Sequence, residues 1–429
     1  MLRTFALVLL LAAMPAAAQP SSPAPGDDGS RQLLSVDDVV REVLAGHPAI
    51  AASALTVQSQ QHRVEPAGAL PDPTLSVAYM GSAAPFRTMA NDPSSYRGLT
   101  AMQMLPLGGK RELRRAMARA ELHAGQADQL AVTRRLKAEA EAAFYDYFYY
   151  SRAQEVTGRD KARLEQMVET TEARYRVGKA TQADVLRAQL EVSMLLQRAA
   201  TLAQQQETAA AHMDLLMGRA IDAPLPPPAD VVRTSLPELA ALAPAAQAND
   251  PALHKEQAMV ERGTLAVSAA HKEYIPDLSV GYMFQQRTGM PDMYGAQFSL
   301  NIPVFYKSRQ REEETAAKLE LSAAEKSREA RKLDLAYELK QMHAMAANAA
   351  KMLNLYDRAI LPQAELALQS SESSYAVGSV DFLTVVTNLT AIYGYEVDYY
   401  RQVADYETAL ARIEALTGDL SQLASEAKQ

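Results

Sequence analysis

The 429-residue sequence contains no cysteine. It can therefore form no disulfide framework and no thiolate metal site, and it has no cysteine that could carry a lipid anchor. Long apolar runs are also missing. A membrane-spanning helix needs roughly 20 consecutive apolar residues, and no run beyond the first residues reaches that length. We therefore expect no transmembrane helix in the mature chain.

Residues with catalytic or metal-binding chemistry form no recognisable pattern. The seven histidines are His47, His62, His123, His212, His254, His271 and His343. They show no H-x-x-x-H or comparable ligand spacing, and no nucleophile with a nearby base stands out. The formal net charge of −8 argues against a nucleic-acid surface. We expect no enzyme activity, no catalytic or metal-binding residues and no cofactor.

The amino terminus has the features of an export signal. Arg3 precedes the apolar run "TFALVLLLAAM", and the small residues Ala16 to Ala18 follow. This pattern predicts a secretory signal peptide over residues 1–18, cleaved after Ala18. The alternative, a membrane anchor, would need a longer apolar run. Residues 19–33 are rich in Pro, Ser, Gly and Asp, which predicts a disordered leader.

One turn sequence occurs twice. "YRVGKATQADVL" begins at Tyr175 and "YAVGSVDFLTVV" begins at Tyr375, 200 residues later. Similarly, "LSVAYM" from Leu75 corresponds to "LSVGYM" from Leu278. Solenoid repeats have periods of about 20 to 50 residues, so the spacing indicates duplication of a whole half of the protein. We predict a first repeat over 34–218 and a second over 236–418. A linker over 219–235 joins them, and a tail over 419–429 follows.

Most of the chain is predicted to be helical. A stretch from Lys110 to about Arg176 lacks proline, and as one helix it would be about 100 Å long. The matching stretch from Lys307 to about Ala376 is interrupted only by Pro362. After each Val-Gly turn another helix is expected, ending near Gly218 or Gly418. Few globular cores could cover rods of this length.

The helix after the second turn has apolar positions in a heptad pattern. Its seam consists of Val385, Leu389, Ile392, Glu396, Tyr399, Val403, Tyr406, Leu410 and Ile413, with one charged exception. A parallel stripe consists of Val386, Tyr393, Val397, Tyr400, Ala404 and Ala411. Two seams on one helix favour a wall of helices over an isolated pair.

Four short strands are predicted, at "TLSVAYM", "GLTAMQML" and near 277–285 and 295–304. In the last of them, apolar residues from Phe298 to Val304 alternate with mostly polar ones. In an exported protein, such alternation fits lipid on one face and a wet lumen on the other. Four strands cannot close a barrel, because about eight is the working minimum. Several chains must therefore share one barrel.

These features together resemble the outer-membrane efflux protein family typified by TolC. The resemblance rests on "YRVGK", "YAVGS", "LLMG" and "ALTG" and on the repeat order, and it covers about 34–418. It implies a mainly α-helical fold with a small β part, in which a long α-helical barrel continues a transmembrane β-barrel. Trimerisation would complete that barrel, with four strands per chain. The resemblance also implies a passive exit duct in outer-membrane lipid, coupled to a periplasmic adaptor and an inner-membrane RND-type transporter.

The resemblance places the repeated turns at the periplasmic ends of the helical hairpins, where they would dock on the adaptor. The residues concerned are Tyr175, Val177, Gly178, Tyr375, Val377 and Gly378. Both glycines are expected in the left-handed conformation that ends helices. The alternative is that they serve only as helix stops.

Acidic residues just past the tips are candidates for a pore gate. Asp184 follows Gly178 by six residues, whereas the equivalent second-half position is Thr384 and the nearest acid is Asp381. In a trimer, either aspartate would form a ring of three carboxylates. The alternative is a solvated acid in a first helical turn, where the helix dipole favours it.

The cargo is indicated only indirectly. "LPLGGKRELR" resembles the equivalent stretch of heavy-metal efflux members of the CzcC and CusC types, which favours metal cations. Drug or dye efflux and type I secretion are the alternatives within the fold, and a periplasmic coiled-coil adaptor is the alternative outside it. Methionines gather around the strands at Met80, Met89, Met102, Met104, Met283, Met290 and Met293. Thioethers suit Cu(I), but we expect these residues to be lipid-facing or gap-filling apolar bulk.

Overall fold

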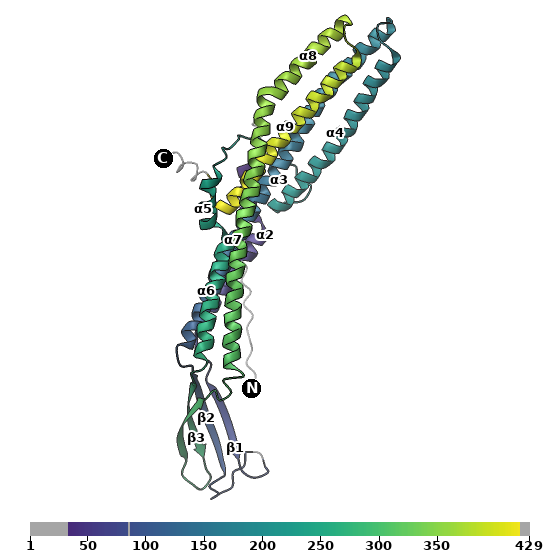
Figure 1. Cartoon of the computed structure of the whole chain (residues 1–429). Coiled ribbons are helices and arrows are strands. Elements are labelled where there is room, and N and C mark those ends of the chain that lie inside the picture. Colours follow the sequence, from purple (N-terminus) through teal and green to yellow (C-terminus); the bar gives the residue numbers. More distant parts are fainter. Residues whose placement is uncertain (1–32, 85, 421–429) are drawn as a thin grey trace, which may run out of the picture.

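The protein, in a computed structural model that describes residues 33–84 and 86–420, is a long rod. Figure 1 shows a small sheet at one end and two helical hairpins at the other. The predicted signal peptide over 1–18 lies outside the described residues. So do residues 19–32 of the predicted leader and residues 421–429 of the predicted tail.

The element order of the first half is repeated in the second. The first half contains α1 (Val36–Gly46), α2 (Pro48–Ala67), β1 (Thr74–Met80), β2 (Tyr96–Leu105), α3 (Lys110–Arg176) and α4 (Gln182–Met217). The second half contains α5 (Leu239–Asn249), α6 (Pro251–Lys272), β3 (Asp277–Gln286), β4 (Met293–Asn301), α7 (Gln310–Leu355), the π-helical turn η1 (Tyr356–Ile360), α8 (Leu361–Val377) and α9 (Phe382–Thr417).

Helix α3 is the spine of the rod. It is continuous over 67 residues, which confirms the predicted rod of about 100 Å. Near the sheet it packs between α2 and α6, and α6 packs against α7. Toward the tips it packs between α4 and α9, and α9 packs against α8. The helices therefore form a wall rather than a globular core (Figure 1).

The two predicted seams of α9 are confirmed. Val385, Leu389 and Ile413 of the first seam are buried, and so are Val386 and Ala404 of the second. The charged exception, Glu396, is paired with Arg159 of α3, so the carboxylate is compensated within the seam. With these two faces α9 packs against α3 and against α7 and α8.

The interruption predicted at Pro362 takes the form of a π-helical turn. Proline has no backbone N–H and its ring crowds the preceding turn. Just before it, the Leu361 N–H bonds to the carbonyl oxygen of Tyr356, five residues back. Such a turn admits an extra residue without ending the helix. The rod therefore continues from α7 into α8.

The four strands form one antiparallel sheet in the order β1-β2-β3-β4. The two halves meet at its centre, where Leu99 of β2 pairs with Phe284 of β3. One face carries mostly apolar side chains: Leu75, Val77, Tyr79, Leu99, Ala101, Leu105, Leu278, Val280, Tyr282, Phe284, Tyr294, Ala296, Phe298 and Leu300. That face is exposed in the single chain, with Phe298 71% accessible.

The last strand is shorter than predicted. It ends at Asn301 rather than near Val304, because Pro303 cannot donate a ladder hydrogen bond and the Val304 N–H instead bonds to the Ile302 carbonyl. The alternation from Ile302 onward therefore belongs to the turn into α7. Among the described residues, no helix is both long and apolar enough to cross a bilayer.

Lysine 110 joins the two halves where sheet and helices meet. Its side chain is buried, and its Nζ lies 2.9 Å from Asp277 Oδ1 and 3.2 Å from Glu273 Oε2. It also donates to the carbonyl oxygen of Ile275 at 2.9 Å. Gly108 and Gly109 before it have φ of +73° and +79°. "LPLGGKRELR" is thus a strand-to-helix turn whose lysine serves the fold.

Two carboxyl groups, the buried Glu407 and the half-buried Glu141, lie between α3 and α9 in the middle of the rod. Burial raises the pKa of Glu407 to about 7, although its carboxylate accepts a hydrogen bond from the Thr234 N–H at 3.1 Å. Burial also raises the pKa of Glu141 to about 7, against the opposing effect of Lys137. The folded state therefore holds protons that the unfolded chain releases near pH 4.5.

We expect Glu407→Gln to stabilise the protein above pH 7 by about 1–2 kcal/mol. Because the folded-state pKa is raised, the carboxyl's contribution is fully present below about pH 4.5 and is lost as the pH rises through about 7. The amide keeps an acceptor for Thr234 but has no charge to desolvate. Thermal unfolding at pH 4 and pH 8 measures this, with the exposed Glu207→Gln on α4 as the control. Equal effects of Glu407→Gln at both pH values would contradict the expectation.

Candidate functional site: the paired helical tips

Both repeated turns end their helices by the same backbone geometry. Gly178 and Gly378 have φ of +70° and +80°, which confirms the predicted left-handed conformation. The Gly178 N–H bonds to the Tyr175 carbonyl at 2.9 Å, and the Lys179 N–H bonds to the Arg174 carbonyl at 2.9 Å. Residues 374–379 repeat this arrangement. It is the Schellman pattern, which satisfies the last carbonyls of a helix.

Space does not explain either glycine. A Cβ built on Gly178 or Gly378 would meet no atom within 4 Å. The left-handed backbone alone favours glycine here. A side chain at these positions would therefore strain the turn without displacing a neighbour.

The two candidate gate acids are both helix caps. At the start of α4, the Thr181 hydroxyl accepts from the Asp184 N–H, and the Asp184 carboxylate accepts from the Thr181 N–H at 2.8 Å. At the start of α9 the residue types are exchanged, and Asp381 accepts from the Thr384 N–H at 3.0 Å. Hydrogen bonds from Thr384 hold the pKa of Asp381 below its usual range.

This exchange explains why Thr384 stands where an acid was expected. Each tip keeps one threonine and one aspartate three residues apart, but in opposite order. Both orders satisfy free N–H groups at a helix start. Capping is therefore a role that both acids fill, and a pore-lining role stays a prediction.

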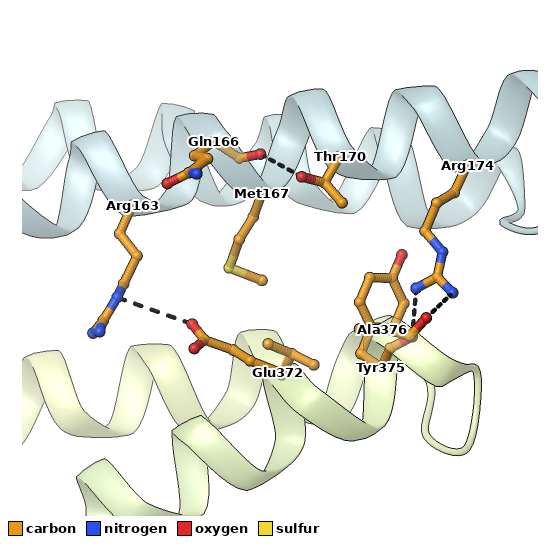
Figure 2. A pocket seen from close by; sticks show the side chains of 9 residues that line it. Arg163, Gln166, Met167, Thr170, Arg174, Glu372, Tyr375 and Ala376 are labelled. Atoms are coloured by element: carbon orange, nitrogen blue, oxygen red, sulfur yellow. Dashed lines mark hydrogen bonds and ion pairs between the residues drawn. The ribbon is translucent and has the colours of Figure 1, made fainter.

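A cleft of about 540 Å³ lies between α3 and α8 just behind the tips. Figure 2 shows Arg174 reaching from α3 to the last turn of α8. Its guanidinium donates to the carbonyl oxygens of Tyr375 and Ala376, the latter at 3.2 Å. The same group stacks over the Tyr375 ring, 4.3 Å from its centroid. Arg174 thus ties the second tip to the first.

A second link crosses the same cleft farther from the tips. Arg163 of α3 lies 3.5 Å from Glu365 and 3.9 Å from Glu372, both on α8. These groups are partly exposed, so each pair contributes little. Together with Arg174 they attach α8 to α3 at two levels (Figure 2).

The six predicted tip residues differ in what they present to solvent. Tyr175, Val177 and Val377 are 47%, 67% and 81% exposed. Tyr375 instead packs against Phe382 of α9, with ring centroids 5.7 Å apart. The two glycines shape the turns.

Sequence reasoning missed Arg174 and Phe382, although both lie beside the repeated motif. The first repeat has arginine before its Tyr-x-Val-Gly, whereas the second has Ser374. This difference between the repeats was the available signal. Within the described residues, no group of three or more His, Cys, Asp or Glu side chains could hold a metal ion.

Comparison with known proteins agrees with this architecture. The model of the family described as outer membrane efflux protein matches residues 39–219 and 242–419. The structure of CusC superimposes with a TM-score of 0.77 at 14% identity, covering 94% of this chain and 99% of that one. VceC from Vibrio cholerae gives 0.75 at 17% identity, covering 89% and 96%. The MtrE channel of Neisseria gonorrhoeae gives 0.74 at 17% identity, covering 89% of each chain. No curated protein matches by sequence.

We expect Arg174→Ala to loosen the last turn of α8. The substitution removes charge-assisted hydrogen bonds to two carbonyls, which are worth about 1.5 kcal/mol at a partly exposed site. Local opening should become about tenfold more frequent. Hydrogen exchange of the backbone amides in 374–379 measures this, and the exposed Arg176→Ala is the matched control. Unchanged exchange in the Arg174 variant would show that the tips are held by other contacts.

Proposed function

Because the chain belongs to the outer membrane efflux protein family, whose members are channels and not enzymes, we propose that it forms the passive exit duct of a tripartite efflux system. The sheet lies in the outer membrane and the helical wall extends into the periplasm. A periplasmic adaptor docks on the tips, and an inner-membrane RND-type pump supplies the energy. The two tandem repeats over 34–218 and 236–418 are the structural units of this duct.

The sheet supports assembly as a homotrimer. Its outer strands, β1 and β4, each have one edge that pairs with nothing in the described chain. Three copies joined at those edges give 12 strands, enough to close a barrel. The exposed apolar face, with Leu75 and Phe298, would then contact outer-membrane lipid.

The helical wall supports the same assembly. Its two lateral edges carry exposed apolar side chains, including Leu190 on α4 and Leu333 and Tyr337 on α7. Exposed apolar groups along the edges of a wall favour contact with the next wall. Three such walls side by side would close the α-helical barrel.

The tips support docking of the adaptor. Tyr175, Val177 and Val377 offer apolar surface at the far end of the rod, beside the turns shaped by Gly178 and Gly378. Asp184 and Asp381 lie at the starts of α4 and α9, next to these turns, and in a trimer they would add a ring of carboxylates at the gate.

For the cargo we propose metal cations, with drug or dye efflux and type I secretion as the alternatives. Lys110 forms ion pairs with Asp277 and Glu273. The stretch "LPLGGKRELR" is therefore explained by the fold and does not indicate which cargo is exported. The support comes from the side chains on the polar face of the sheet.

The trimer can be tested at the edge of the wall. We expect the double substitution Leu333→Asp and Tyr337→Asp to convert the trimer to monomers, because burying two carboxylates in an apolar contact costs several kcal/mol. Light scattering of the detergent-purified protein measures the mass. The neighbouring exposed Lys332→Asp is the control. A stable trimer in the double variant would exclude this edge from the interface.

The efflux function can be tested at the second tip. Deleting the gene should cause hypersensitivity to exported compounds in a panel of copper, silver, zinc, cobalt, dyes and antibiotics, and the intact gene should restore resistance. Gly378→Asp should form normal outer-membrane trimers but restore resistance at least tenfold less well, because its side chain strains only the turn. Gly394→Ala, at a glycine of α9 with open space around it, is the control. No hypersensitivity to any compound would argue against an efflux duct.

A further inference from the structure

The strand register sorts methionine onto one face of the sheet. The apolar face contains no methionine. The opposite face carries all five strand methionines: Met80, Met102, Met104, Met283 and Met293. These residues were expected to be lipid-facing or gap-filling apolar bulk. The register puts all five on the face that bears serine, threonine, glycine and glutamine, so they do not accompany the apolar residues that we expect to face lipid.

Apolar bulk does not account for this placement. Leucine, valine and phenylalanine are used repeatedly on the apolar face, but none of them occurs on the methionine face. Met80, Met104 and Met293 are more than two-fifths exposed, so these three fill no gap within the chain, whereas the half-buried Met102 and Met283 lie over glycines. Methionine is the one large aliphatic side chain on this face, and it differs from leucine by its thioether sulfur.

Three of these methionines form a diagonal across neighbouring strands. Met102 of β2 pairs with Gly281, two residues before Met283 of β3. Met283 pairs with Gly295, two residues after Met293 of β4. Diagonal neighbours on one face are about 7–8 Å apart, within reach of long side chains. Met104 lies two residues after Met102 on the same face of β2.

Glycines leave space for these side chains. A Cβ on Gly295 would lie 3.2 Å from the Met283 methyl, and one on Gly281 would lie 3.7 Å from the Met102 methyl. The Gln285 side-chain amide also donates to Met283 Sδ at 3.3 Å. The Met283 sulfur therefore faces a polar neighbour and accepts a hydrogen bond from it through one lone pair.

We propose that the row Met102, Met104, Met283 and Met293 is a transit site for soft monovalent metal ions, Cu(I) or Ag(I), inside the duct. The inference rests on the proposed function, since a closed barrel turns this face toward the lumen. Neutral thioether sulfur suits soft monovalent ions such as Cu(I), whereas Zn²⁺ is bound by thiolate, imidazole and carboxylate ligands, none of which is in the row. Successive neutral sites bind weakly enough for an ion to move from one to the next.

Binding of Ag(I) to the purified full-length trimer tests the row. Equilibrium dialysis followed by metal analysis measures affinity. The sheet variant combines Met102→Leu, Met283→Leu and Met293→Leu, which conserve volume. The control variant carries Met194→Leu, Met345→Leu and Met352→Leu on exposed helical positions. We expect the sheet variant alone to lose at least tenfold in affinity. No Ag(I) binding by the wild type, or equal binding by all three proteins, would overturn the proposal.

Growth assays separate this proposal from the efflux function. The sheet variant should restore resistance to dyes, antibiotics and zinc as the wild type does, but not to silver. If the wild type is an outer-membrane trimer that restores resistance while the sheet variant restores silver resistance equally, only the methionine row fails. If the wild type forms no outer-membrane trimer, the duct itself fails, and the row with it. Where the triple variant does not assemble, the single Met283→Leu decides between the same outcomes.

Discussion

The structure depends on one constraint, which is that a helix of about 100 Å must be covered by neighbours along its whole length. No single partner in this chain is long enough to accompany α3. Four long helices do most of this, with α2 and α6 covering α3 near the sheet and α4 and α9 covering it toward the tips, and the short helix α1 adds a further contact. The repeated element order meets this need, because each half supplies one long helix for each segment. The small buried residues of α3, such as Ala120, Ala140 and Ala153, let these partners approach closely.

Local signals in the sequence were enough to predict the long helices and the strands. Absence of proline predicted α3, and alternation predicted the strands. The tip glycines were predicted from the helix-ending chemistry of Tyr-x-Val-Gly. What could not be predicted depends on residues far apart in the chain. The partners of Arg174 are on α8, which lies beside α3 only in the folded protein. Glu396 interrupts an apolar seam in the sequence, and only the structure shows that it pairs with Arg159. The methionine diagonal likewise requires the pairing of β2 with β3.

By contrast, the exchange of Thr181 and Asp184 with Asp381 and Thr384 could have been predicted from capping rules. Comparing only equivalent positions of the two repeats hid it, because the threonine and the aspartate stand in opposite order.

The two hairpins share a turn but differ in the geometry of their first helices. The first rod is one uninterrupted helix, whereas the second contains the π-helical turn before Pro362. A π-helical turn is a place where a helix can change direction. Beyond it, α8 is attached to α3 through Arg174 and Arg163 across the cleft of Figure 2. The second hairpin therefore differs from the first in containing a π-helical turn and in contacting α3 through side chains that line a cleft.

The methionine face of the sheet has almost no charge with which to attract a charged cargo. On the methionine face of the four strands, all of which the structure describes, the only ionisable carboxylate is Asp277. Lys110 neutralises it at 2.9 Å, and the Leu107 N–H also donates to it at 3.2 Å. This face therefore cannot attract cations by charge, and any preference there must come from ligand type. Neutral thioethers discriminate by softness and hold ions only weakly. That combination suits the last part of an exit path, where an ion must be distinguished from water and salt but must still leave.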